Sequence, residues 1–279
     1  MKIVGCMIWY DEQPSMLASS VAGLAKVADE IVAVDGAYVL FPSATVRSHP
    51  EQSEAILRAA ETEDVGVTIH RPRQLFFGNE IEKRNLSLQL AAPFCDEGDW
   101  ILAWDADYHL HTCNPGLVRS ELAETDCLAA TYTILESIDY MGGNDFLRDY
   151  AVKRPVDTRY TIRTRGVYRW APDLRYQNAH FLMKGTYNGR ERWVYGPDLV
   201  GGKAPGWEQD DGSGFCEAHN LNRHLVVYHR RGERPLSRQN SADEYYRRRD
   251  QAGIEVIDFG DGPVDPDTGK PVERETQAA

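Results

Sequence analysis

The sequence predicts an α/β fold in which a mostly parallel central sheet is flanked by helices, followed by a more strand-rich second half. In the first half, short β-branched runs alternate with segments of helical periodicity, a pattern typical of βαβ units. The 279 residues are 42% hydrophobic, which is enough for one large domain or for one domain with an additional lobe. In such sheets, ligands bind beyond the carboxyl ends of the strands.

Residue spacing and helix-start signals predict the elements of the first half. Pro14 and Pro50 each stand where a helix can begin, because the fixed φ of proline suits the first helical position. After Pro14, apolar residues recur at helical spacing as far as Val27. In chain order, the expected elements are a strand at 2–9, a helix at 14–27, a strand at 30–35, a helix at 50–63, a strand at 65–70, a helix at 80–92 and a strand at 100–104.

The second half has a different pattern, with one expected helix at 114–125 and then strand-like runs. Frequent Gly and Pro predict a long surface loop at 196–214. We expect a first half at 1–112, a second half at 113–254 and an irregular or mobile tail at 255–279. The strand-like runs are 127–135, 159–163, 167–170, 179–184 and 224–229.

The composition argues against several classes of protein. The net charge of -12 disfavours a broad nucleic-acid-binding surface. The five cysteines include no CxxC pair, which disfavours both a disulfide framework and a zinc site and fits a reducing cytoplasm. No apolar run reaches the ~18 residues that a membrane-spanning helix needs. Asp11 and Glu12 interrupt the first apolar stretch too early for a signal peptide.

Carboxylates follow three of the predicted strands. Asp11 comes after the first strand, Asp35 closes the second, and Asp105 and Asp107 end the buried run DWILAWDADYHL. A buried carboxylate without a partner costs several kcal/mol, so a cation is expected beside these acids. In an extended segment, residues two apart point the same way, and hard ions such as Mg²⁺ or Mn²⁺ take oxygen ligands shared with phosphates. The sequence therefore predicts a divalent-metal site for a diphosphate.

Four segments in this order resemble the nucleotide-sugar-binding half of family 2 glycosyltransferases, which have the GT-A fold: IWYDEQ, DEIVAVDGAY, KRNLSLQLA and DWILAWDAD. The resemblance covers residues 1–112 and implies a Rossmann-like sheet. It also implies a DxD motif that holds Mn²⁺ or Mg²⁺ against the donor diphosphate. The implied residues are Asp11 or Glu12 and Asp35 for the nucleoside, Lys83, Arg84 and Asn85 for the diphosphate or ribose, and Asp105 and Asp107 for the metal.

The segment RHLVVYHRRGERP, at 223–235, is cationic in an otherwise acidic chain. By resemblance, His229 at the end of its apolar run is the third metal ligand, with His224 as the alternative. Arg230 would stabilise the leaving diphosphate as its charge grows. A surface histidine beside solvated arginines is the other interpretation.

The catalytic base is left open by the sequence. Related enzymes carry a His-Glu pair in the acceptor-side segment, whereas Phe181 follows His180 in this chain. A transfer with inversion needs a carboxylate or His within hydrogen-bond reach of the acceptor hydroxyl. The candidates are His180, Glu208, Asp210, Asp211, Asp139 and Asp145; Trp170, Tyr176, Trp193 and Trp207 are either a stacking surface for the acceptor or core residues.

The predicted function is that of a metal-dependent glycosyltransferase, of the hexosyltransferase class, which moves a sugar from a UDP- or GDP-sugar to an acceptor hydroxyl. The acceptor could be a glycan, a protein, a lipid or a modified nucleic acid. The alternatives are a non-catalytic nucleotide- or glycan-binding module and a DxD phosphatase, although a phosphatase normally has its DxD after the first strand. A nucleotidyltransferase would need a Gly-rich basic loop where WYDEQPS stands.

Overall fold

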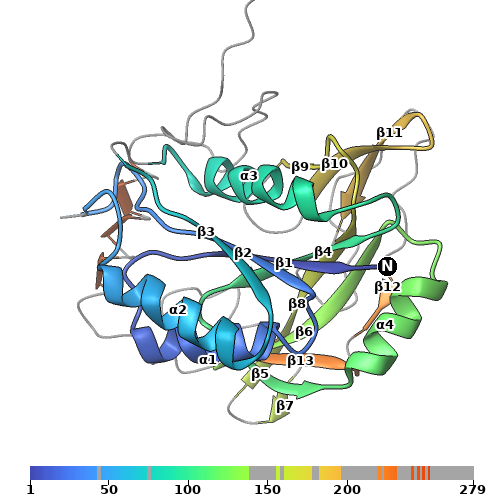
Figure 1. Cartoon of the computed structure of the whole chain (residues 1–279), viewed down its shortest axis with the longest axis horizontal. Helices are drawn as coiled ribbons and strands as arrows, with labels where there is room; N and C mark the ends of the chain where they lie inside the picture. The colour runs from blue at the N-terminus through green and yellow to red at the C-terminus, as the bar shows by residue number, and fades with distance from the viewer. Residues whose placement is uncertain are drawn as a thin grey trace, which may run out of the picture.

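The computed structural model of the chain has a ten-stranded curled sheet with helices on both of its faces (Figure 1). Helices α1 and α2 cover one face, and α3 covers the other. A second, three-stranded antiparallel sheet lies beyond α3. The structure describes residues 1–42, 45–73, 77–137, 155–157, 160–177, 182–195, 219–221, 223–230, 240–241, 244–245, 247–248 and 251.

The alternation of strands and helices predicted for the first half is confirmed. The elements in chain order are β1 (Ile3–Ile8), α1 (Pro14–Leu24), β2 (Glu30–Val34), α2 (Pro50–Thr62), β3 (Gly66–His70), α3 (Glu80–Ala91), the 3₁₀ turn η1 (Ala92–Phe94), β4 (Trp100–Asp105), β5 (Tyr108–Cys113), α4 (Pro115–Glu124), β6 (Ala129–Ser137), β7 (Pro155–Asp157), β8 (Tyr160–Arg169), β9 (Arg175–Tyr176), β10 (Leu182–Tyr187), β11 (Arg190–Tyr195), β12 (His219–Asn220) and β13 (Leu225–His229).

The strand order β3-β2-β1-β4-β8-β6-β13-β5 brings the ends of distant strands together. Strands β3, β2, β1 and β4 are parallel, and Ile8 at the end of β1 pairs with Val34 on one side and Asp105 on the other. The residues that follow β1, β2 and β4 therefore share one edge, as the sequence predicts. The pairs β4–β8 and β6–β8 are antiparallel, so the sheet as a whole is mixed.

Several details differ from the sequence prediction. The strand β5 was not among the strands expected from the sequence; it pairs antiparallel with β13. The runs 159–163 and 167–170 form one continuous strand, β8, which crosses Gly166. At Gly166 a side chain would collide with the ring of Tyr168, so glycine lets the strand continue. The predicted loop at 196–214 and tail at 255–279 lie outside the described residues.

Strand β4 joins the two apolar layers of the core. Trp100 and Trp104 pack into the layer under α1 and α2, whereas Ile101 and Ala103 pack into the layer under α3. Burying a large apolar side chain contributes about 1.5–3 kcal/mol. The indole Nε1 of Trp104 donates to the hydroxyl of Ser20 at 2.9 Å. The core therefore fixes the end of β4, where the acids begin.

Short polar side chains set the starts of the helices. Asn79 accepts a hydrogen bond from the backbone N–H of Glu82 at the start of α3, and Asn114 does the same for Leu117 in α4. These caps fix where α3 begins and therefore where its charged first turns lie. Of the helices in the described part of the chain, none combines the length and the apolar composition that a membrane crossing requires.

Candidate functional site

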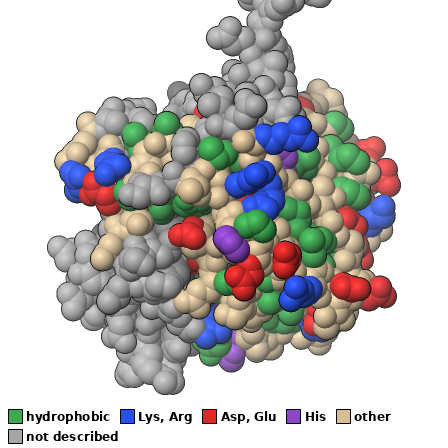
Figure 2. All heavy atoms as spheres, turned by 60° about the vertical axis from the view of Figure 1, so that its left-hand side comes forward, with side chains coloured by type: hydrophobic (Ala, Val, Ile, Leu, Met, Phe, Trp, Pro, Cys, Tyr) green, Lys and Arg blue, Asp and Glu red, His purple; other side chains and the backbone are tan. Residues whose placement is uncertain are grey.

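The candidate site is the edge of the sheet at the carboxyl ends of β1, β2, β3 and β4, which we call the rim. It comprises residues 9–12, 35–36, 71, 105–107 and 229–230 together with Ser48 of the loop before α2. Figure 2 turns this side of the molecule forward and shows acidic, basic and histidine side chains gathered on one face. A parallel sheet offers such an edge to ligands because its strand ends point into loops.

Asp107 and His229 come together at the β4–β13 side of the rim. The imidazole Nε2 of His229 lies 3.0 Å from Oδ2 of Asp107, although the two residues are 122 positions apart. The backbone N–H of Arg230 donates to the carbonyl of Asp107 at 2.9 Å, which holds the end of β13 against the turn after β4. The side chains are 3% and 12% exposed for Asp107 and His229. The sequence prediction placed these two residues in one site, and the structure brings them into contact.

Asp105 is turned toward α3, where it meets Arg84. Arg84 donates from Nη2 to Oδ1 of Asp105 at 2.6 Å and also contacts Oε1 of Glu80 at 2.7 Å. The guanidinium is nearly buried, whereas the carboxylate of Asp105 is 20% exposed. The cation expected beside the DxD acids is an arginine for Asp105, whereas Asp107 has the imidazole of His229 as its partner. Arg84 divides its charge between two carboxylates, those of Glu80 and Asp105.

Asp35 lies at the β2–β3 side of the rim and is completely buried. Its Oδ1 accepts from the backbone N–H of Gly36 at 2.7 Å and from the Ser48 hydroxyl at 2.6 Å. Its Oδ2 accepts from the backbone N–H of Ser48 at 2.9 Å and from Nε of Arg71 at 3.3 Å. A carboxylate has about four acceptor positions, and here protein donors occupy all of them. In this structure Asp35 is not available to a nucleoside.

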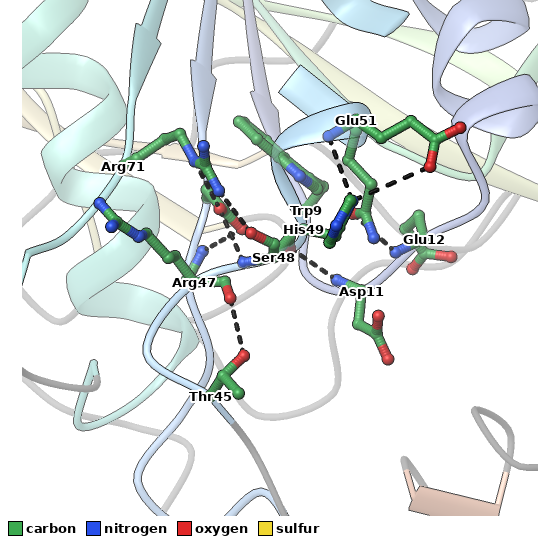
Figure 3. A network of polar contacts seen from close by, with 12 residues as sticks. Trp9, Asp11, Glu12, Thr45, Arg47, Ser48, His49, Glu51 and Arg71 are labelled. Carbon is green, nitrogen blue, oxygen red and sulfur yellow. Dashed lines mark hydrogen bonds and ion pairs between the residues drawn. The ribbon is translucent and has the colours of Figure 1, made fainter. Parts of the chain in front are cut away.

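The two acids after β1 differ from each other. Asp11 is exposed, and its carboxylate points away from the surrounding polar network (Figure 3). Glu12 is 4% exposed, and its backbone N–H donates to the side chain of Gln52 at 3.1 Å. Of the two alternatives that the sequence leaves for the nucleoside, Asp11 has the accessible carboxylate.

Lys83 and Asn85 are buried residues of α3. The ammonium of Lys83 donates to the carbonyls of Trp9 and Gly36, the latter at 2.6 Å, and so joins the loops after β1 and β2. Asn85 accepts from the backbone N–H of Tyr176 at 2.7 Å and donates back to its carbonyl. Asn85 therefore attaches α3 to the second sheet and lies away from the predicted diphosphate or ribose.

Arg230 is held beside the Asp107 turn by two residues that the sequence did not single out. Its Nη1 lies 3.2 Å from Nδ1 of His109, which also contacts the hydroxyl of Ser19 at 2.7 Å. An arginine can only donate, so Nδ1 of His109 is the acceptor in this contact. The structure thus fixes the position of the guanidinium predicted to face the diphosphate.

The acceptor-side predictions divide into two groups. Trp170 and Tyr176 are core residues, 7% and 1% exposed, rather than a stacking surface. His224 pairs with Glu121 of α4 at 3.0 Å, in a separate cluster that also contains His219. His180, Asp139, Asp145, Glu208, Asp210, Asp211 and Trp207, with the side chain of Trp193, lie outside the described residues.

Within the described ranges, no three His, Cys, Asp or Glu side chains gather closely enough to hold a metal ion. The predicted ligand trio is therefore present as the pair Asp107–His229, with Asp105 directed to Arg84. Two donors at 3.0 Å match the spacing of neighbouring ligands on an octahedral ion, because bonds of about 2.1 Å place adjacent ligands about 3.0 Å apart. The pair fits a borderline ion such as Mn²⁺, which accepts both imidazole and carboxylate.

Two rim residues, Ser48 and Arg71, and Glu80 at the start of α3 were missed by the sequence analysis. Arg71 directly follows β3, so the rule that selected acids at strand ends would have found it had it been applied to cations as well. Ser48 lies two residues before Pro50. The proline was interpreted only as the start of a helix, so the residues before it were not considered as site residues. Glu80 looks like an ordinary residue of a helical first turn.

The chain was compared with known proteins by sequence. No protein-family model matches it, and a search of curated proteins found no significant match. The description of the site therefore stands on the geometry of the rim.

Proposed function

We propose that the chain is a metal-dependent glycosyltransferase of the GT-A type, which uses a nucleoside-diphosphate sugar as its donor. The observation that carries the proposal is the Asp107–His229 contact at the carboxyl end of the sheet. A carboxylate and an imidazole from distant segments, beside a positioned arginine, form a site for a divalent ion and an anion. The resemblance of residues 1–112 to family 2 glycosyltransferases supports the same function.

In this proposal, different residues of the rim bind the metal ion and the phosphates of the donor. Asp107 and His229 would hold Mn²⁺ or Mg²⁺, which when bound neutralises the diphosphate. Arg230 would donate hydrogen bonds to the departing phosphate, and its charge is available at once because His109 already orients it. Asp105 would remain partly exposed and join the ligands when Arg84 turns toward the diphosphate.

The alternative is a binding module of the same fold that holds the nucleotide without transferring the sugar. The observation in its favour is the replacement of the acceptor-side His-Glu pair by His180 and Phe181. The two functions differ in turnover. A transferase releases nucleoside diphosphate from the donor slowly even in the absence of acceptor, whereas a module binds the donor and leaves it intact.

The test is a panel of UDP- and GDP-sugars, with binding measured by calorimetry and release of nucleoside diphosphate measured in Mn²⁺ or in EDTA. We expect at least one donor to bind only with Mn²⁺. Asp107→Asn, which keeps the shape of the side chain, should lower this affinity by about 100-fold. Asp126→Asn, at an exposed site outside the rim, is the matched control and should bind as the native protein does. Equal binding in EDTA would refute the proposal.

A further inference from the structure

The C-terminal segment of the chain returns to the rim and packs on the loop after β2. Of this loop, residues 37–42 and 45–46 are described, and we call them the β2 loop. In Figure 1 the C-terminal segment lies at the left-hand edge, beyond the carboxyl ends of β2 and β3. Tyr245 is 6% exposed, and its ring stacks on that of Tyr38 with centroids 5.1 Å apart. The ring of Phe41 lies 6.0 Å from that of Tyr245. Both ring partners therefore belong to the β2 loop.

The β2 loop is in turn attached to the end of β1. Phe41 packs edge-on against Tyr10, with ring centroids 5.2 Å apart. The backbone N–H of Thr45, in the same loop, donates to the hydroxyl of Tyr10 at 3.0 Å. Aromatic pairs at such distances attract each other beyond the effect of burial alone. The rings of Tyr245, Phe41 and Tyr10 therefore form a continuous row from the C-terminal segment to the residues that follow β1.

The β2 loop also pairs with the residues before α3. Tyr38 and Phe77 form an isolated parallel bridge, and the backbone N–H of Val39 donates to the carbonyl of Phe77 at 2.8 Å. The ammonium of Lys83, on α3, lies 5.4 Å from the centre of the Tyr38 ring. Tyr38 therefore contacts α3 through Lys83 and the C-terminal segment through Tyr245.

The C-terminal segment is held on the β2 loop by few contacts. Its described residues are helical: 240–241, 244–245, 247–248 and 251. Glu244 accepts hydrogen bonds from Arg247 at 2.6 and 2.7 Å and from Arg248 at 2.7 Å, which favours the helix whether or not it is docked. Of these described residues, only Tyr245 is buried. One buried ring contributes about as much free energy as the ordering of about two residues costs. Docking of the segment is therefore close to balance.

We infer that the C-terminal segment is a strap. When Tyr245 docks on Tyr38 and Phe41, the strap holds the β2 loop against the end of β1, and when Tyr245 leaves, the loop opens this side of the rim. The strap is a property of the chain alone, whereas its effect on a ligand rests on the proposed function. A nucleotide that contacts the closed loop would bind the docked form more tightly and would leave the rim after the strap is released.

Hydrogen exchange of two backbone amides reports the strap without any ligand. The N–H of Val39 is bonded to the carbonyl of Phe77, and that of Thr45 is bonded to the hydroxyl of Tyr10. In Tyr245→Ala both amides should exchange about tenfold faster than in the native protein, because the loop loses the ring that covers it. Tyr245→Phe keeps the ring and should retain the native rates. Native rates in Tyr245→Ala would overturn the inference.

Tyr187→Ala is the matched control. Tyr187 is a partly buried tyrosine of β10, in the second sheet, and its hydroxyl donates to a carbonyl at the end of β8. Its substitution should leave the rates at Val39 and Thr45 unchanged. Leu102, at the centre of β4, reports global unfolding, and its amide should exchange in Tyr245→Ala as slowly as in the native protein. The strap is refuted if Tyr187→Ala loosens the β2 loop as well, or if Leu102 is accelerated as much as the loop.

The effect on the site is measured as the dissociation rate of UDP and of GDP in Mn²⁺, by stopped-flow displacement. Tyr245→Ala should release the bound nucleotide about threefold faster or more, and Tyr187→Ala should release it at the native rate. Faster amide exchange with an unchanged dissociation rate would overturn the link between the strap and the ligand. If neither nucleotide binds the native protein while the Val39 and Thr45 amides respond to Tyr245→Ala, the proposed function fails and the strap stands.

Discussion

At the β2–β3 side of the rim, Asp35 is completely buried and accepts from two backbone amides, a hydroxyl and a guanidinium. At the β4–β13 side, Asp105 and Asp107 meet the side chains of Arg84 and His229, and Asp105 is 20% exposed. Backbone amides cannot leave a carboxylate without unfolding the loop, whereas side chains can rotate toward a ligand. Two groups of acids that look alike in the sequence therefore differ in their partners: backbone amides hold Asp35, whereas side chains contact Asp105 and Asp107.

The largest effect expected from this comparison is on stability. Asp35→Ala should lower the free energy of unfolding by about 3–5 kcal/mol, because it leaves a partly buried guanidinium and buried N–H donors without their acceptor. Urea denaturation measures the change. Asp126→Ala, at an exposed position, should change it by about 0.5 kcal/mol or less. A small effect at Asp35 would mean that the loop before α2 is not held by this carboxylate.

A buried cation, Lys83, also joins the loops at the β2–β3 side of the rim, and its contribution to stability can be tested in the same way. Lys83→Met keeps the length of the side chain but removes the donors to the carbonyls of Trp9 and Gly36. Leaving buried carbonyls unsatisfied should cost about 1–3 kcal/mol of unfolding free energy. Lys26→Met removes a half-exposed lysine paired with Glu63 and should cost about 1 kcal/mol or less. If Lys83→Met and Lys26→Met lower the unfolding free energy equally in urea denaturation, the buried Lys83 does not stabilise the rim more than an exposed lysine stabilises the surface.

Metal titration can test whether a metal ion can replace the side-chain partners of the acids at the β4–β13 side of the rim. In Arg84→Gln, Asp105 loses the guanidinium that competes with a cation, so the affinity for Mn²⁺ alone should rise by about 3- to 10-fold. Arg71→Gln is the matched change on the other side and should leave the affinity unchanged, since Asp35 remains enclosed by amides and a hydroxyl. Titration calorimetry measures these affinities. A weaker affinity for Mn²⁺ in Arg84→Gln than in the native protein would argue against replacement of the guanidinium by the metal ion.

The last prediction concerns a thiol, Cys95, whose pKa is raised chiefly by burial. Burial, with the charge of Asp99 next in importance, raises the pKa of Cys95 from 9.0 to about 12. A raised folded-state pKa stabilises the protein fully below pH 9 and progressively less as the pH rises from 9 toward 12. Unfolding free energy measured across this range should fall less steeply for Cys95→Ser than for the native protein. Parallel curves would show that Cys95 does not contribute.

The first half of the fold could be predicted because its signals are local. Alternating periodicities and proline positions predict β1 to β4 and α1 to α3 to within a few residues. The parallel order then places Asp35 and Asp105 on either side of the end of β1. The strand β5 was missed, although Tyr108 and Leu110 alternate with His109 and His111 as in a strand; the segment is short and follows β4 after only two residues.

The candidate site was predicted in part for the same reason. Residue type and strand position identify which acids reach the rim. Asp107 and His229, which the sequence predicts as metal ligands, are in contact, and metal binding by them stays a prediction. Hydrogen-bond partners depend on the fold. The sequence could not show that Asp35 is saturated, or that Asn85 contacts Tyr176 of the second sheet.

The position of β8 between β4 and β6 has a consequence for how the protein is made. Strand β4 has β1 on one side and β8, which is synthesised much later, on the other. A nascent chain that ends after the first half therefore has an open strand edge at its centre, where another chain can pair. His229 arrives later still, on β13, so the ribosome has completed most of the polypeptide before His229 can meet Asp107.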